Sequence, residues 1–258
     1  MMYPNNKQLI HFMLCLCLVI LSPRAVAGEL LTPREDNTKR VLTGFPVRQL
    51  ILPAVLVTYG TVEALAASRV RLLNYAIGHP ILLHPPAKIK ANDATQYFPI
   101  GSVYALNLIG IRGRHHFRDC SVILGLSALF MAASVNALKY TTRELRPDKS
   151  ARNSFPSGHT AMAFMGAEFL HQEYKELSIW YGIAGYTIAA CTGACRVYNN
   201  KHWVGDVSFG AGLGILSTKL AYWLSPAIEE LLARKGKTLS LSPFYNGRHG
   251  GLSCSLSL

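Results

Sequence analysis

Long stretches without a charged residue dominate the middle of this chain. Uncharged runs cover residues 94–111, 120–138 and 177–195, with 18, 19 and 19 positions, and they are rich in Leu, Ile, Ala and Gly. A membrane-spanning helix needs about 20 mostly apolar residues, within a range of roughly 17–25. A soluble core helix of that size normally shows a polar face, which 120–138 and 177–195 barely do. Each run therefore predicts a helix of membrane-spanning length.

Charged residues interrupt three further apolar stretches, at residues 49–67, 158–172 and 203–225. The first has only 14 uncharged positions before Glu63. Glu168 interrupts the second, and Asp206 and Lys219 interrupt the third. We expect such groups to face the bundle or, for Lys219, to snorkel to the membrane surface. Together the six stretches predict an all-α, membrane-embedded bundle of about six helices, in a domain over residues 47–230.

The regions that flank this domain differ in composition. Residues 1–27 combine a lysine, an apolar run and the small residues Ala25-Val26-Ala27, which predicts a signal sequence; an uncleaved first membrane helix is the alternative. A polar segment follows at 28–46. Residues 231–258 form a basic tail in which Asn246-Gly247 favours a β-hairpin, with a frayed tail as the alternative.

Composition narrows the choice of partners. Only 16% of the residues are charged, against roughly 25% in soluble domains, and the net charge is +12. These values exclude intrinsic disorder, coiled coil and collagen. The basic excess favours an anionic partner: nucleic acid, an anionic membrane surface or a phosphorylated substrate. The six cysteines form no CxxC pair and no cluster at zinc spacing, so a disulfide framework or metal site is not expected.

The first of three polar motifs follows the 120–138 run. Lys139 and Arg146 are seven positions apart, and Pro147 comes next. On a helix this spacing is about two turns, so we expect both cations on one face of a helix that Pro147 ends. Two aligned cations bind an anion, and arginine can fork onto two phosphate oxygens. An ordinary basic loop end is the alternative.

The second motif is Pro156-Ser157-Gly158-His159. Proline and serine are common at helix starts, where the first backbone N–H groups point at an anion. Gly158 lets the backbone approach a ligand closely, and His159 is a candidate proton donor. A plain helix cap is the alternative.

The third motif contains Arg196, His202 and Asp206. His202 and Asp206 are four apart and share a helix face, so the carboxylate can accept a hydrogen bond from one ring nitrogen and leave the other as a nucleophile. Taken alone, this is also the pattern of a surface His/Asp pair. Together the three motifs supply what phosphoryl transfer without a metal needs: cations, backbone donors, a nucleophile and an acid.

The order and spacing of the motifs resemble the three-part signature of the phosphatidic acid phosphatase type 2 superfamily. Six residues separate Lys139 from Arg146-Pro147, five separate Arg196 from His202, and three more precede Asp206. The third part usually begins Ser-Arg, whereas this chain has Cys195-Arg196. That departure puts one minor hydrogen bond in doubt.

The resemblance implies a role for each matching residue. His202 would attack phosphorus and form a phosphohistidine, Asp206 would orient His202, and His159 would protonate the leaving oxygen and then activate water. The phosphate oxygens would be held by Lys139, Arg146, Ser157, Gly158 and Arg196. The resemblance implies an α-helical bundle, no metal and no cofactor, and it removes nucleic acid as the explanation of the positive charge.

The uncharged runs favour the membrane lipid phosphatase branch of that superfamily, at a bacterial inner membrane. We expect hydrolysis of a phosphomonoester or pyrophosphate on an envelope lipid. Similarity of general layout to bacterial lipid A phosphatases puts lipid A first, before undecaprenyl pyrophosphate, phosphatidic acid and phosphatidylglycerol phosphate. A secreted, soluble, non-specific acid phosphatase of the same superfamily is the alternative, and a non-catalytic phospholipid-binding or transport protein a remote one. The oligomeric state stays open.

Loop charges predict the side of the membrane on which the motifs lie. The basic residues of 112–118 and 234–237 favour the cytoplasm for those segments, which places all three motifs on the periplasmic side of a multi-pass protein. A signal sequence followed by three full spans would reverse this orientation. We therefore expect 49–67 not to span the membrane fully.

Overall fold

The computed structural model describes residues 47–65, 92–234, 238–245 and 250–257. The expected signal sequence at 1–27 and the polar segment at 28–46 both lie outside the described residues.

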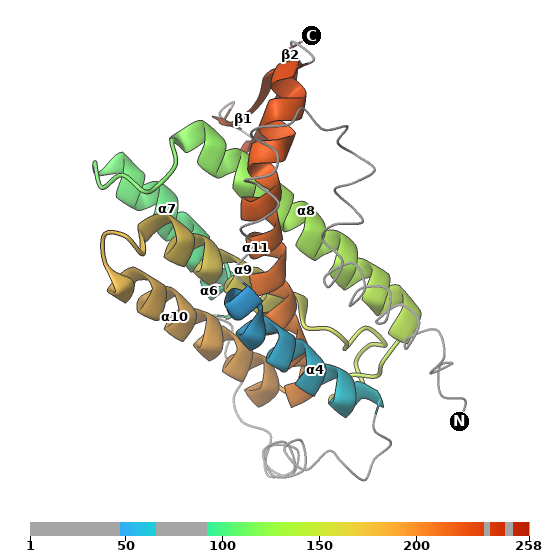
Figure 1. The fold of residues 1–258 in the computed structure, drawn as a ribbon. Helices are drawn as coiled ribbons and strands as arrows, with labels where there is room; N and C mark the ends of the chain where they lie inside the picture. Colours follow the sequence, from blue (N-terminus) through green and yellow to red (C-terminus); the bar gives the residue numbers. More distant parts are fainter. Residues whose placement is uncertain (1–46, 66–91, 235–237, 246–249, 258) are drawn as a thin grey trace.

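Helices make up most of the described structure, and each of the six stretches expected to be helical corresponds to one (Figure 1). The helices are η1 (Val47–Leu50), α4 (Ile51–Leu65), α6 (Asn92–Thr95), α7 (Phe98–Leu108), α8 (Phe117–Thr142), α9 (Gly158–Tyr174), α10 (Ile179–Tyr198) and α11 (Val204–Arg234). The predicted α-helical bundle of about six helices is therefore confirmed.

A small antiparallel hairpin follows the helices at the C-terminal end of the chain. Strand β1 (Thr238–Tyr245) pairs with β2 (Gly250–Ser257), with Thr238 opposite Ser257 and Tyr245 opposite Gly250. It is the hairpin that the Asn246-Gly247 pair favours. The last helix, α11, runs on to Arg234, so it extends into the region that the sequence assigns to the tail.

Helix α9 forms the centre of the bundle, with α10 and α11 packed along it. Most of its residues are buried. Glycines on α11 allow the close approach of α9, because a Cβ added at Gly210 would lie 2.6 Å from the Ser157 carbonyl oxygen, and one at Gly214 would lie 2.3 Å from that of Ala161. Any larger residue would separate the two backbones. This packing places the start of α11, and hence the third motif, beside the start of α9.

The stretch at 94–111 is not one membrane-length helix. It contains the end of the four-residue α6 and the 11-residue α7, with a turn at Gln96–Tyr97 between them. Pro99 lies in the first turn of α7, where its missing N–H costs nothing, and it could not continue a helix from α6. The prediction of a full span from 94 to 111 is therefore wrong.

Mean hydropathy distinguishes helices that could cross a membrane from those that could not more clearly than the absence of charge does. One of them, α8, is long and apolar enough to cross a membrane, with a mean hydropathy of 1.9 in its best window, of which 39% is buried. Helix α10 has the length, at 20 residues, but its Gly, Thr and Tyr residues lower its hydropathy. The expectation of three strong spans is thus met by α8 alone on this criterion.

Two buried charges inside the bundle pair with each other. Lys219 Nζ on α11 lies 2.7 Å from Glu168 Oε1 on α9, and the Lys219 side chain is only 11% exposed. Gln172 Nε2 donates to the same carboxylate at 2.5 Å, and the Tyr186 hydroxyl donates to it as well. Glu168 faces the bundle, as expected. Lys219 does not snorkel, because a buried carboxylate partner is within reach one helix away.

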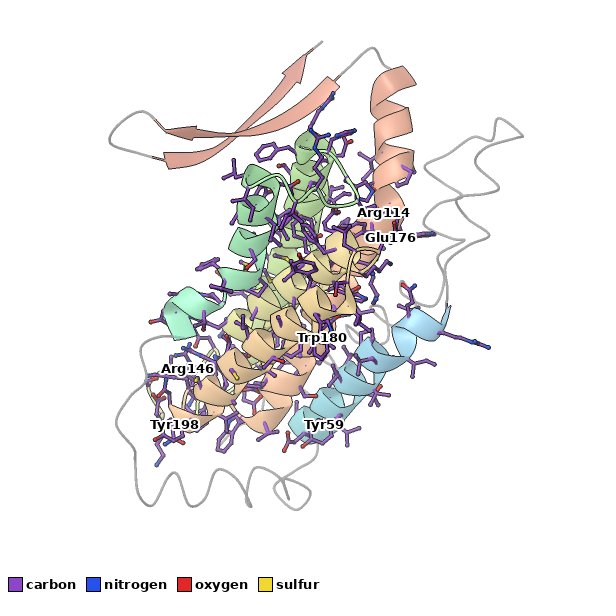
Figure 2. All side chains as sticks on the ribbon, turned by 90° about the vertical axis from the view of Figure 1, so that its left-hand side faces the viewer. Tyr59, Arg114, Arg146, Glu176, Trp180 and Tyr198 are labelled. Carbon is purple, nitrogen blue, oxygen red and sulfur yellow. The ribbon has the colours of Figure 1, made fainter. Side chains whose placement is uncertain are left out.

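The bundle has two chemically different ends (Figure 2). At one end, labelled by Arg114 and Glu176, the buried Glu173 carboxylate accepts hydrogen bonds from His115 Nδ1 at 2.8 Å and the Tyr222 hydroxyl at 2.5 Å. His115 therefore anchors a basic loop, as the sequence predicts for 112–118. The other end, labelled by Arg146, carries the ends of α8 and α10 and the starts of α9 and α11. We call it the site end.

Candidate active site

All three sequence motifs meet at the site end. The loop at 143–157, between α8 and α9, is joined to the start of α11 by backbone and side-chain hydrogen bonds: Ser157 N–H donates to the Asp206 carbonyl at 3.0 Å, and Trp203 Nε1 donates to the Leu145 carbonyl at 3.0 Å. Residues some 50 positions apart in the chain are thereby held against one another. The packing of α9 on α11 holds the loop at 143–157 and the start of α11 in this arrangement.

His202 is buried in a pocket that fixes its ring. Its side chain is 2% exposed, and Nδ1 lies 2.8 Å from the Ser154 carbonyl oxygen. Since a carbonyl oxygen only accepts, Nδ1 must carry the proton, which leaves the lone pair on Nε2. The geometry therefore assigns the tautomer that a nucleophilic histidine needs.

The contact between the Asp206 carboxylate and the His202 ring is longer than the hydrogen bond that the four-residue spacing predicts. Asp206 Oδ2 lies 3.5 Å from His202 Nδ1, so the shorter contact of this nitrogen is the Ser154 carbonyl. The same carboxylate oxygen accepts from Ser154 Oγ at 2.5 Å and from the Trp203 N–H at 2.9 Å. Burial lowers the pKa of His202, and the Asp206 carboxylate opposes that shift. Ser154 thus links the two residues, a role that the sequence did not reveal.

The two cations of the first motif do not share a helix. Helix α8 ends at Thr142, and Arg143 adopts a left-handed conformation with φ 47°. Beyond it, the backbone pairs within the loop, since Arg146 N–H donates to the Ala151 carbonyl at 3.0 Å. Only Lys139 lies on the helix, where Nζ donates to the Asn153 carbonyl at 2.6 Å. The predicted continuous helix up to Pro147 is therefore wrong.

The loop nevertheless brings the cations together. The charges of Arg146 and Arg196 both act on Lys139, and those of Arg196 and Lys139 act on His202. Among the described atoms, Nε of Arg146 is buried and has no hydrogen-bond partner. A buried guanidinium donor without a protein partner is costly, and an anion placed there would satisfy it.

Ser157 and Gly158 begin α9 as the sequence predicts. Ser157 is the N-cap residue: its Oγ lies 3.5 Å from the Thr160 N–H and 2.9 Å from the Thr160 hydroxyl. A Cβ added at Gly158 would meet only Val135 Cγ1, at 3.8 Å, which is an ordinary contact. Packing within the described protein therefore does not require glycine here, which is consistent with close approach of a ligand to the backbone.

His159 and Arg196 are connected through a residue that the motifs do not contain. His159 Nε2 lies 3.1 Å from Asp93 Oδ1, and Arg196 Nη1 lies 3.8 Å from the same oxygen. Asp93 belongs to the short helix α6 and appears in the sequence only as the charged residue before an apolar run. No spacing rule connects positions 93 and 159, so this contact could not be predicted from the sequence.

A second ion pair braces the loops of the site. Lys201 Nζ lies 2.6 Å from Asp148 Oδ2, and Asp148 N–H donates to the Asn200 carbonyl at 3.1 Å. Burial alone would raise the pKa of Asp148, but hydrogen bonds from Lys201 and Ser150 lower it to about 2. Asp148 is thus ionised at any physiological pH, so this brace between the loops does not depend on pH in that range.

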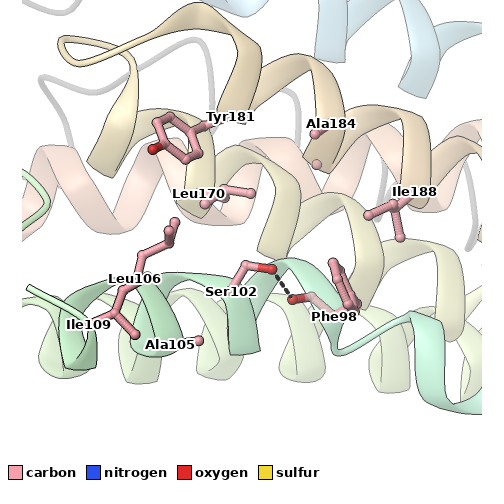
Figure 3. A pocket seen from close by; sticks show the side chains of 10 residues that line it. Phe98, Ser102, Ala105, Leu106, Ile109, Leu170, Tyr181, Ala184 and Ile188 are labelled. Atoms are coloured by element: carbon pink, nitrogen blue, oxygen red, sulfur yellow. Dashed lines mark hydrogen bonds between the residues drawn. The ribbon is translucent and has the colours of Figure 1, made fainter. Parts of the chain in front are cut away.

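An apolar groove of about 310 Å³ lies between α7, α9 and α10 (Figure 3). Its walls include Phe98 and Leu106 from α7 and Ala184 and Ile188 from α10. Ile188 is two helical turns before Arg196, on the same face of α10. Between them, Thr192 Oγ1 pairs with Thr95 Oγ1 of α6 at 2.9 Å. The groove therefore follows one face of α10 toward the site.

The family comparison agrees with the motifs. A sequence model of the PAP2 superfamily matches residues 120–230, a region that contains every residue of the three motifs. The predicted resemblance to this superfamily is thereby confirmed.

Two curated relatives match parts of the chain. A lipid A 1-phosphatase of Porphyromonas gingivalis is 43% identical over 140 residues, which cover 54% of this chain and 32% of the relative. A bacitracin transport permease protein, BcrC, of Bacillus licheniformis is 33% identical over 76 residues, covering 30% of this chain and 36% of the relative. The chain thus spans about a third of the length of each.

Two crystal structures show a more distant likeness. LpxE of Aquifex aeolicus has 22% identity and a TM-score of 0.43, over 58% of this chain and 92% of that protein. A transmembrane PAP2-type phosphatidylglycerolphosphate phosphatase of Bacillus subtilis has 21% identity and a TM-score of 0.44, over 69% of this chain and 97% of that protein.

Proposed function

From the PAP2 superfamily match of residues 120–230, we propose that this protein is a membrane lipid phosphatase that works through a phosphohistidine and needs no metal. The observation that carries the proposal is the state of His202. Its Nδ1 proton is hydrogen-bonded to the Ser154 carbonyl, and its Nε2 lone pair is left for attack beside two cations, Arg196 and Lys139. Buried His/Asp pairs of purely structural function do not need such a surplus of positive charge.

Each group at the site end has one part in the proposed reaction. His202 Nε2 attacks phosphorus while the bond to the lipid oxygen breaks, and His159 gives that oxygen a proton. Water then attacks the phosphohistidine, its proton returns to His159, and the N–P bond breaks. The charge on the equatorial oxygens is stabilised by guanidinium, ammonium and backbone donors. These are supplied by Lys139, Arg146, Ser157, Gly158 and Arg196.

The proposed membrane location rests on where apolar side chains lie. Large hydrophobic residues are exposed on several helices, among them Leu52 and Val55 on α4, Leu129 on α8 and Ile179 on α10. A bilayer would cover these side chains, whereas water would not. Helix α4 has 15 residues, a length of about 22 Å, which is less than the roughly 30 Å of a hydrocarbon core. That shortness fits an inner-membrane protein whose site end faces the periplasm.

Lipid A is the first proposed substrate. The support is the 43% identity to a lipid A 1-phosphatase, over a stretch of 140 residues. Undecaprenyl pyrophosphate, phosphatidic acid and phosphatidylglycerol phosphate are the next candidates, because the motifs recognise the phosphate and not the lipid attached to it. A soluble acid phosphatase of the same superfamily is the second candidate function, and the exposed apolar side chains argue against it.

Phosphate release from a panel of lipids tests this proposal. We expect the purified protein in detergent to release phosphate from lipid A in preference to undecaprenyl pyrophosphate and phosphatidic acid, and to keep its full rate in EDTA, because side chains supply the positive charge. Colorimetric phosphate assays with and without chelator give the comparison. Loss of activity on chelation would contradict the metal-free mechanism. A higher rate on p-nitrophenyl phosphate than on every lipid would favour the soluble acid phosphatase class.

The apolar groove leads to a further prediction, that it holds one acyl chain of the lipid. Since lipid chains already lie in hydrocarbon, the groove would contribute packing and orientation rather than transfer from water. Filling it by Ala184→Trp is expected to lower kcat/KM for long-chain phosphatidic acid by about tenfold, as misplacement of a substrate does. Hydrolysis of p-nitrophenyl phosphate should not change.

A neighbouring position supplies the control for this experiment. Ile183 is exposed on α10 and does not line the groove, so Ile183→Trp adds the same bulk outside it. Equal losses in the two variants, or an equal loss on both substrates, would show that the groove does not hold the chain.

A further inference from the structure

We propose that Asp93 is the positioning residue of the acid His159, so that the site contains a second His–Asp pair beside His202 and Asp206. The inference rests on the proposed function, because it assigns His159 the proton transfers of that reaction. Asp93 lies outside residues 120–230 and outside all three motifs. Its assignment comes from the tertiary contacts alone.

The contact geometry matches that of a residue which orients an imidazole. Asp93 Oδ1 lies 3.1 Å from His159 Nε2, within hydrogen-bond distance, and the two residues are 66 positions apart. A carboxylate only accepts, so Nε2 carries a proton and donates a hydrogen bond to Asp93 Oδ1. The other nitrogen, Nδ1, is then the one from which a proton passes to the leaving oxygen.

The helix that carries Asp93 is held against the bundle near the site. The Thr95 hydroxyl on α6 pairs with the Thr192 hydroxyl on α10 at 2.9 Å, and Thr192 is one turn before Arg196. Gln96 Nε2 donates back to the Asp93 carbonyl at 2.9 Å. These bonds hold the backbone of α6 in place, so the Asp93 carboxylate reaches His159 from a fixed position even though its side chain is 69% exposed.

The charges around His159 explain why a carboxylate is needed. Burial disfavours the protonated form of the ring, and the positive charges of Arg196 on α10 and Arg146 in the loop after α8 disfavour it further. Asp93 on α6 acts on the ring with negative charge, through both its charge and its hydrogen bond. A general acid must hold a proton at the working pH, next to the cations that bind phosphate. Asp93 supplies the compensating charge.

The two His–Asp pairs would then differ in the nitrogen that is anchored. In His202, Nδ1 is anchored by the Ser154 carbonyl, and Nε2 is available as an unprotonated nucleophile. In His159, Nε2 is anchored by Asp93, and Nδ1–H is available as an acid. His159 lends its proton to the leaving lipid oxygen in the first step, and takes one from water in the second, so Asp93 would serve both steps.

Asp93→Asn tests the proposal through the leaving group. An alkyl or lipid phosphate releases an alkoxide that needs a proton, whereas p-nitrophenyl phosphate releases a stable phenolate that does not. We expect kcat/KM, which covers the steps up to release of the leaving group, to fall on the order of 10- to 100-fold on phosphatidic acid, within what general acid catalysis contributes. We expect kcat/KM on p-nitrophenyl phosphate to change less than about threefold. Asp93→Glu should restore part of the loss on the lipid.

The pH dependence of kcat on the lipid distinguishes a positioning role from a structural one, because loss of a purely structural residue would not shift it. Without the carboxylate, His159 loses its proton at lower pH, so the alkaline decline of kcat on the lipid should shift toward lower pH. Glu176→Gln is the matched control, because Glu176 is exposed at the opposite end of the bundle and its loss removes the same charge (Figure 2). That variant should keep both the rate and the profile of the wild type.

Each other outcome overturns the proposal. Equal losses on both substrates would make Asp93 a structural residue. A lower KM with an unchanged or higher kcat would make it a competitor of the phosphate at Arg196. NMR titration of ring-labelled histidines, with His159→Gln to assign the signal, measures the pair without catalysis. If the wild type hydrolyses nothing, the proposed function fails; if the His159 titration midpoint does not fall in Asp93→Asn, the pairing itself fails.

Discussion

Replacement of His202 by glutamine is expected to lower phosphate release from lipid by at least about 1,000-fold, as loss of a nucleophile does in enzymes that form covalent intermediates. Glutamine keeps a polar side chain of similar size but cannot attack phosphorus. The buried ring otherwise contacts the Ser154 carbonyl and Asp206, so the variant removes the nitrogen that would carry the phosphoryl group. Initial rates in detergent measure the effect.

The intermediate itself distinguishes this mechanism from general base catalysis. Rapid quenching of the wild type with a labelled lipid phosphate should trap an acid-labile, alkali-stable phosphoprotein, which His202→Gln should not form. His116 supplies the control, because it is exposed at the opposite end of the bundle and its side chain caps nothing. His116→Gln should therefore behave as the wild type. Full activity in His202→Gln would exclude the phosphohistidine mechanism.

The pH dependence of the wild type follows from the burial of His202. Burial lowers the pKa of this histidine. The ring therefore becomes neutral, and able to attack, at a lower pH than the value of about 6.5 at which a free histidine titrates. The acid limb of kcat/KM should accordingly lie below that value. An acid limb well above it would mean that the Asp206 carboxylate outweighs burial.

Replacement of Arg146 by alanine has the second largest expected effect, a loss of about 100- to 1,000-fold in kcat/KM. Its buried Nε has no hydrogen-bond partner among the described residues, and its charge acts on both Lys139 and His159. Removal of one preorganised donor to a developing negative charge costs about this much in other enzymes. Competitive inhibition by orthovanadate should weaken in parallel, because it reports binding of the anion.

Two further variants make this result specific. Arg146→Lys keeps the charge without the fork and should recover only part of the loss. Arg152 is exposed in the same loop, so Arg152→Ala removes an equal charge and should change the rate little. A loss in Arg152→Ala as large as in Arg146→Ala would indicate a general electrostatic effect rather than a phosphate contact.

The sequence predicts local features of this structure better than it predicts long-range contacts. Hydrophobic runs located all six predicted helices, because a helix that must bury or shield apolar side chains needs an unbroken supply of them. Length was less well predicted. The stretch at 94–111 breaks at Gln96–Tyr97, and α8 ends four residues after the run does. An uncharged run does not show where the backbone hydrogen bonds of a helix end, so it does not predict the bounds of the helix.

Lys139 and Arg146 illustrate this limit. Their spacing suggests one helix face, and the resemblance requires them to act together. The structure brings them together by a loop, after Arg143 turns left-handed and ends the helix. A motif records that residues must meet, but several backbone paths allow the meeting, and the hydrogen bonds between the loop and α11 select one.

The sequence by itself determined the class of this protein: a helical bundle, three motifs at helix ends, and the residues proposed to carry phosphoryl transfer. Each of these follows from neighbours along the chain, through hydropathy, capping and spacing. Only the tertiary structure decided that Ser154 fixes the His202 tautomer, that Glu168 pairs with Lys219, and that Asp93 reaches His159. Those contacts join residues about 50 to 66 positions apart, and they exist only because close packing of α9, α10 and α11 brings their elements into reach.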